Sequence, residues 1–149
     1  MKQNRKGFTL AELLIVVATI GILSVIAIAA FAMEPEKQKE TADLANLRQA
    51  EALAVTVYVT KLDGEGNPII DELKADGQVT LYLDADKGNL VREKPSKGYG
   101  KGTSVSGGCE DFPMGDGRTY TTRSNVKGKV IRTVILADGQ IRLSWVDKK

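Results

Sequence analysis

The chain has 149 residues, a formal net charge of +2, one cysteine and no histidine. This length suits one modest domain. A single thiol cannot form a disulfide within the chain, and without histidine there is no Cys-His or Ser-His catalytic pair and no common zinc site. The composition therefore excludes much of the usual catalytic repertoire.

The small net charge hides a separation of charge along the chain. Residues 34–86 contain 5 basic and 12 acidic residues, whereas residues 118–149 contain 8 basic and 2 acidic ones. From residue 34 onward the two signs balance, which argues against a generic polyanion binder, and we predict no specific nucleic-acid partner. The basic end could contact DNA or an acidic surface, complement the acidic region of another copy, or be scattered solubilising charge.

The first predicted element is an apolar helix. Residues 8–32 include one charged side chain, Glu12. Their 25 positions would span about 37 Å as a helix, against about 30 Å of bilayer hydrocarbon. The rest of the chain has too little apolar sequence to enclose such a helix as a core element. We therefore predict a single membrane pass over residues 8–33, with Lys2, Arg5 and Lys6 on the cytoplasmic side and the remainder exported.

The front edge of this helix carries a specific motif. Residues 6–23 read KGFTLAELLIVVATIGIL, in which a basic residue, Gly7 and Phe8 precede a threonine and the carboxylate of Glu12. This stretch resembles the type IV pilin family, including the pseudopilins of type II secretion and competence systems. The resemblance implies that prepilin peptidase cuts between Gly7 and Phe8, removes the leader 1–7 and methylates the new N-terminus at Phe8. The chain departs from the family's frequent proline near Ala29, because its first proline is Pro35.

Glu12 needs a partner, since a carboxylate in the hydrocarbon region costs on the order of 2.5–3.5 kcal/mol. Cleavage after Gly7 would create an α-amino group at Phe8 with a reference pKa near 7.7–8.0. Glu12 lies one helical turn from Phe8, so it could pair with its own N-terminus and also interact favourably with the positive end of the helix dipole. Alternatively, it could pair with the Phe8 amine of a neighbouring copy and fix the register of bundled helices. The family resemblance favours the pairing between copies, which makes Glu12 and Phe8 assembly residues.

Residues 34–62 are predicted to continue the helix as an amphipathic segment that ends near Val59. Pro35 either kinks one continuous helix or opens a second one. The apolar positions recur at helical spacing and predict a face that packs on a sheet or forms a seam between copies. They are Leu44, Leu47, Ala50, Ala54, Val57 and Tyr58.

Residues 63–149 are predicted to form a globular head. A turn cluster at 63–68 ends the helix, and residues 69–77 are compatible with a short helical turn. Strands are predicted at 79–83, 90–92, 119–124, 129–136 and 141–146, and the Asp138-Gly139 pair marks the last two as a hairpin. The fold class is α+β: a long N-terminal helix, with a membrane-spanning first half, packed against a small antiparallel sheet, as in pilins.

Residues 94–118 form a long glycine-rich loop, either an exposed functional segment or a flexible connection. Pilins often close this region with a disulfide, which Cys109 cannot form within one subunit, although a bridge between subunits is possible. Asp84, Asp86 and Asn89 suggest calcium but lack the glycine and terminal glutamate of an EF-hand loop, and residues 63–67 fail similarly. We predict solvated turns there, and neither a metal nor a cofactor.

The sequence thus predicts a structural subunit, not an enzyme. The resemblance implies a precursor in the cytoplasmic membrane that polymerises with other copies into a surface filament for adhesion, motility or DNA uptake. Its other partners would be the membrane, prepilin peptidase and pilus or secretion assembly machinery. The alternatives are a pseudopilin of a type II secretion or competence system and, from a different class, a membrane-anchored extracellular binding or enzymatic domain.

Overall fold

The computed structural model describes residues 9–103, 111–120 and 125–149, with the exception of the side chains of residues 23–34. The chain divides into two compact units, Met1–Pro35 and Glu36–Lys149, and each is described by itself. The second unit is called the head below. Cys109 and the predicted cleavage residues Gly7 and Phe8 lie outside the described residues.

Helix α1 runs from Leu10 to Thr60 and includes Pro35, so a single helix is present where the sequence left two possibilities open. The helix ends because Lys61 adopts a left-handed conformation with φ of 59°. The Lys61 N–H still donates to the Val57 carbonyl at 2.8 Å. The end lies one residue beyond the position that the sequence predicts.

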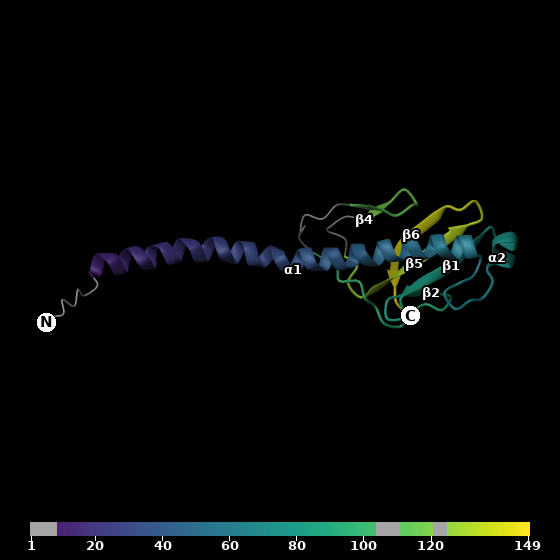
Figure 1. Ribbon diagram of the computed structural model, residues 1–149, viewed down its shortest axis with the longest axis horizontal. Coiled ribbons are helices and arrows are strands. Elements are labelled where there is room, and N and C mark those ends of the chain that lie inside the picture. The colour runs from purple at the N-terminus through teal and green to yellow at the C-terminus, as the bar shows by residue number, and fades with distance from the viewer. Residues whose placement is uncertain (1–8, 104–110, 121–124) are drawn as a thin grey trace, which may run out of the picture. The chain divides into compact units, whose positions relative to one another are not determined.

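The head combines the end of α1 with two antiparallel sheets, which confirms the predicted α+β class (Figure 1). The main sheet has the strand order β2-β1-β5-β6. Its strands are β1 (Gln78–Asp84), β2 (Asn89–Val91), β5 (Lys129–Leu136) and β6 (Ile141–Asp147). Helix α2 (Ile70–Ala75) precedes β1, and a small sheet pairs β3 (Phe112–Pro113) with β4 (Thr119–Tyr120).

Two details of the small sheet differ from the sequence prediction. Strand β3 lies inside the predicted loop 94–118, where two residues, one of them a proline that cannot donate to a ladder, give almost no strand signal. Strand β4 corresponds to the first two residues of the predicted strand 119–124. The remaining positions, 121–124, lie outside the described residues.

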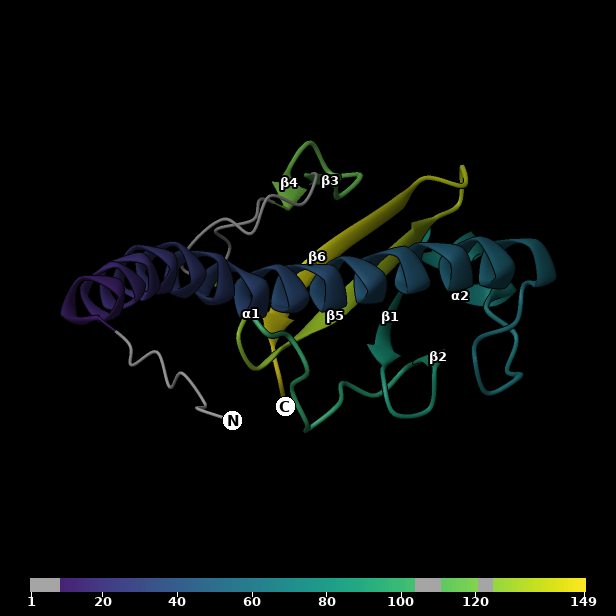
Figure 2. The same ribbon diagram turned by 60° about the vertical axis from the view of Figure 1, so that its left-hand side comes forward.

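The core of the head lies between α1 and one face of the main sheet (Figure 2). The predicted helical stripe is buried at five positions, and Tyr58 is half-buried against the same cluster, which confirms its role as core. Alternate residues of β1, beginning with Val79, complete the contact. Full burial of one such aliphatic side chain contributes about 1.5–3 kcal/mol. The helix residues in this cluster are Leu44, Leu47, Ala50, Ala54 and Val57.

Tyr99 completes the hydrogen bonding of the sheet where β1 and β5 separate. These strands pair as far as Tyr82 and Arg132. Beyond that point the Tyr99 hydroxyl donates to the Leu83 carbonyl at 2.9 Å and accepts from the Ile131 N–H at 2.8 Å. Burial raises the pKa of the Tyr99 phenol far above its usual value, although the Ile131 N–H acts in the opposite direction. The hydroxyl is therefore a neutral donor and acceptor that substitutes for the missing ladder bonds.

The start of the predicted loop is fastened to α1 by a buried carboxylate. Asp43 accepts the backbone N–H groups of Lys101 and Gly102 at 2.7 and 2.9 Å, and the Tyr120 hydroxyl at 3.3 Å. Gly100 must be glycine here, because a Cβ would lie 2.0 Å from the Val126 carbonyl oxygen. Within residues 94–118, the positions around 98–103 are therefore held by hydrogen bonds and close backbone packing.

Thr133 places a polar hydroxyl group in the apolar core. It is fully buried, and within the described part of the chain its hydroxyl has no hydrogen-bond partner. We predict that Thr133→Val raises the free energy of unfolding by about 1 kcal/mol, because an unpaired buried hydroxyl is costly. Urea unfolding of the full chain in mild detergent, followed by the fluorescence of Trp145, measures it. The matched exposed change Thr80→Val should have no effect, and a loss of stability in Thr133→Val would contradict the prediction.

Candidate functional site

The first turn of α1 is a reciprocal capping box. The Thr9 N–H and hydroxyl donate to Glu12 Oε2 at 2.9 and 2.8 Å, and the Glu12 N–H donates to Thr9 Oγ1 at 3.3 Å. Thr9 is thus the N-cap of a helix that begins at Leu10, and Glu12 occupies the third helical position. Together the two side chains satisfy backbone N–H groups that the start of a helix leaves unpaired.

This geometry gives Glu12 a partner that the sequence interpretation missed. The spacing Thr-x-x-Glu is a visible signal for a capping box, whereas the sequence interpretation assigned Glu12 to the Phe8 amine and to the positive end of the helix dipole. Since Gly7 and Phe8 lie outside the described residues, the cleavage site and the pairing of Glu12 with Phe8 stay predictions. What is observed is a carboxylate held at the helix start, with its side chain exposed.

The first turns of α1 present apolar side chains to solvent. Leu10 is 84% exposed, Leu14 69% and Ile22 65%. The intervening large aliphatic residues are also exposed, namely Leu13, Ile15, Val16, Val17 and Ile20. Such a continuous apolar surface is a site of association or of membrane contact in a native protein.

The predicted membrane span covers residues 8–33. Residue 8 and the side chains of residues 23–33 lie outside the described part of the chain. Among the residues that the structure describes, no helix is long and apolar enough to qualify as a membrane span.

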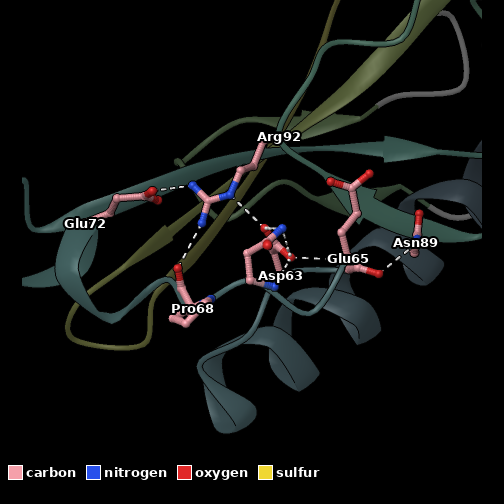
Figure 3. Close-up of polar contacts among 8 residues, drawn as sticks. Asp63, Glu65, Pro68, Glu72, Asn89 and Arg92 are labelled. Atoms are coloured by element: carbon pink, nitrogen blue, oxygen red, sulfur yellow. Dashed lines mark hydrogen bonds and ion pairs between the residues drawn. The ribbon is translucent and has the colours of Figure 1, made fainter.

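The head holds a second polar centre around Arg92 (Figure 3). Its Nε donates to Asp63 Oδ2 at 2.7 Å, and a terminal nitrogen donates to the Pro68 carbonyl at 3.0 Å. The other terminal nitrogen pairs with Glu72 of α2. One guanidinium therefore ties the end of β2 to the loop after α1 and to α2.

Asp63 is the buried member of this centre, with no exposed side-chain surface. Its Oδ1 accepts the backbone N–H groups of Glu65 and Asn67 at 2.9 and 2.8 Å. Burial raises the pKa of the Asp63 carboxyl, but the Asn67 N–H and the Arg92 guanidinium outweigh it, so the pKa is lowered overall. The group predicted as a solvated turn residue is instead a buried anion that closes a loop.

The acidic turn at 84–89 is built by local hydrogen bonds. Asp84 Oδ1 accepts the N–H groups of Asp86 and Lys87, both at 3.1 Å, and Asp86 pairs with Lys97 at 3.0 Å. In the described ranges no group of three or more His, Cys, Asp or Glu side chains is placed to hold a metal ion.

A groove of about 380 Å³ borders this turn. Several of the charged side chains along it pair with each other, as Lys149 does with Glu93. Such an arrangement resembles a salt-bridged surface more than a binding site with convergent unpaired groups.

The comparison with known families concerns the same helix start. Residues 2–31 match the family model of the prokaryotic N-terminal methylation motif. The chain carries a prepilin signal peptide. This class III signal peptide belongs to type IV pilins and pseudopilins, and it implies a membrane-anchored precursor, processing by prepilin peptidase and assembly into a filament or a secretion machinery. No solved structure matches the chain.

The Asp63–Arg92 pair predicts how the stability of the head depends on pH. Since the Asp63 pKa is lowered on folding, the ionised carboxylate stabilises the head above about pH 4, and this contribution is lost as the pH falls through the lowered pKa. Asp63→Asn should flatten the pH dependence of the unfolding midpoint below pH 4.

At pH 7, Arg92→Met should cost roughly 3 kcal/mol, since it leaves a buried anion unpaired. The free energy of unfolding of Arg92→Lys should lie between those of Arg92→Met and the wild type, because an ammonium cannot reach all three partners at once. Urea titrations of each variant measure these differences. Equal stability of Arg92→Met and the wild type would refute the role of the pair.

Proposed function

We propose that the chain is a type IV pilin-like structural subunit that polymerises through α1 into a surface filament. The observation that carries the proposal is the exposed apolar start of α1, which lies within the matched N-terminal methylation motif. An apolar helix surface left open by its own chain becomes favourable when other copies or lipid cover it. We infer that lipid covers it in the precursor and other copies cover it in the filament.

The alternative within the same class is a pseudopilin of a type II secretion or competence system, because both groups carry the matched motif. Electron microscopy of cells with a tag in the 94–118 loop separates the two. Long labelled surface fibres support the pilin. A short stub confined to the envelope supports the pseudopilin, and label that stays in an unpolymerised membrane protein supports an anchored extracellular domain.

Processing is the first requirement of the proposal. We expect mass spectrometry of material sheared from the cell surface to give a subunit that begins at Phe8 and carries one added methyl group. Gly7→Leu should block this cut, because the resemblance places the peptidase at the Gly7-Phe8 junction, and should leave the precursor in the membrane. Assembled filaments whose subunits begin at Met1 would contradict the claim.

Glu12 is proposed to pair with the Phe8 amine of another copy after cleavage. That role and the capping box make different demands on the side chain. Capping needs an oxygen acceptor, which a glutamine also offers, whereas pairing with an amine in a low-dielectric bundle needs the negative charge. The two roles can therefore be separated by substitution.

We predict that Glu12→Gln inserts into the membrane and is processed but yields few filaments. Thr9→Ala keeps the charge and removes the Thr9 hydroxyl from the box, at a cost of about 1 kcal/mol in helix stability, and should still assemble. Sheared-filament yield and membrane content measure both variants. Normal filament yield from Glu12→Gln would refute the charge pairing, and loss of assembly in Thr9→Ala alone would assign Glu12 to capping.

A further inference from the structure

The chain contains four Asp-Gly pairs, and all of them lie outside the helices and strands. In such a pair the backbone nitrogen of glycine can attack the preceding aspartate side chain, because glycine has no Cβ to hinder the approach and reaches the required backbone angles easily. The same dipeptide thus occurs in four surroundings, which the structure ranks by their protection. The pairs are Asp63-Gly64, Asp76-Gly77, Asp116-Gly117 and Asp138-Gly139.

The reaction is an isomerisation that needs only water. The glycine nitrogen forms a bond to the Cγ atom of the protonated carboxyl group and loses its proton, and water leaves, which gives a five-membered succinimide. Water then adds to one of its two carbonyl carbons and breaks one C–N bond. Breaking the bond to Cγ restores aspartate, whereas breaking the bond to the original backbone carbon gives isoaspartate. The nitrogen must therefore be accessible, and the carboxyl group must be able to take up a proton.

Two of the four pairs are protected at the glycine nitrogen. The Gly64 N–H donates to the Leu90 carbonyl at 2.9 Å, and the Gly139 N–H donates to the Leu136 carbonyl at 3.0 Å. Asp63 also has no exposed side-chain surface. Either pair can react only after its turn opens, so its rate falls with the population of the open form.

The Asp116-Gly117 pair is protected at the carboxyl group. The Arg118 Nε donates to Asp116 Oδ2 at 2.8 Å, and the Arg118 backbone N–H donates to Oδ1 at 3.0 Å. The hydrogen bond from the Arg118 side chain lowers the pKa of the Asp116 carboxyl, although slight burial acts in the opposite direction. Because the ionised carboxylate is a poor target for the attack, this ion pair slows the reaction.

Asp76-Gly77 has none of these protections. Both residues are exposed, and a Cβ at Gly77 would have no atom within 4 Å. Within the described part of the chain the Asp76 carboxylate has no hydrogen bond or ion pair, and the Gly77 N–H has no acceptor. Asp76 follows the six-residue helix α2, whose buried residue is Leu73, and the end of so short a helix opens at little cost.

We propose that Asp76 is a site of spontaneous isoaspartate formation in the folded protein, and that the fold protects the other three pairs. The modification lengthens the backbone by one methylene group between α2 and β1 and leaves a free carboxylate on the α-carbon. It also disturbs the Gly77 carbonyl, which accepts the Ala137 N–H at 2.8 Å and so joins the start of β1 to the turn after β5. An aged subunit therefore differs from a new one at this junction.

The test is peptide mapping by mass spectrometry of the full chain, kept folded in mild detergent for several weeks at mildly acidic pH and body temperature. Electron-transfer fragmentation distinguishes isoaspartate from aspartate at each of the four positions. We expect isoaspartate to accumulate at position 76 roughly tenfold or more faster than at 63, 116 or 138, because each protected pair must first open or lose its ion pair. In urea the unfolded chain should react at similar rates at all four positions.

Two variants separate the causes. Asp76→Glu keeps the charge and should abolish the modification at this position, because the corresponding ring has one more member and forms far more slowly. Arg118→Gln removes the ion pair, so it should raise the rate at Asp116 severalfold and leave the rate at Asp76 unchanged. The unfolding midpoints of both variants should match that of the wild type, since both side chains are exposed.

Isoaspartate that forms at position 76 no faster than at position 138 in the folded chain would overturn the inference, as would its absence at position 76. The same ranking of the four positions in the unfolded chain would also overturn it, because the sequence rather than the fold would then set the rates. The measurement uses isolated subunits, so its outcome does not depend on whether the chain forms filaments.

Discussion

The exposed apolar surface at the start of α1 is the constraint on which the rest of this molecule depends. Aliphatic side chains from Leu10 to Ile22 are left open by the part of the chain that the structure describes, and water penalises that exposure. The start of α1 therefore needs lipid or another molecule to cover it, whereas the end of α1 is part of the core of the head.

Two buried carboxylates, Asp43 and Asp63, fasten loops of the head to α1 and to the segment that follows it. Asp43 on α1 accepts two backbone N–H groups of the segment that leaves β2 and the hydroxyl of Tyr120, so it gathers distant parts of the chain onto the helix. Asp63 and Arg92 close the loop that follows the helix. In small exported domains a disulfide often holds such loops in place. A chain with one cysteine cannot form an internal disulfide, and here hydrogen bonds and an ion pair hold the loops. The head is thus held by hydrogen bonds and ion pairs around α1.

The parts of the fold that the sequence predicted are those with local signals. The helical repeat from Leu44 to Val57 and the Asp138-Gly139 turn each depend on neighbouring residues, and both elements form as expected. Asp43 and Arg92 were missed because their partners are 20 to 77 positions away, and only the tertiary fold brings them together. Asp43 also lies among charged residues that resemble the solvent face of a helix. The capping box of Thr9 and Glu12 has a local signal, the Thr-x-x-Glu spacing, which the predicted pairing of Glu12 with the Phe8 amine did not use.

Electron cryomicroscopy of filaments sheared from cells that make this chain tests the central claim most directly. We predict a helical reconstruction in which the apolar half of α1 packs against other copies in the filament interior and the head faces outward. A surface fraction that contains the protein only as single subunits, or filaments in which residues 10–22 face solvent, would contradict it.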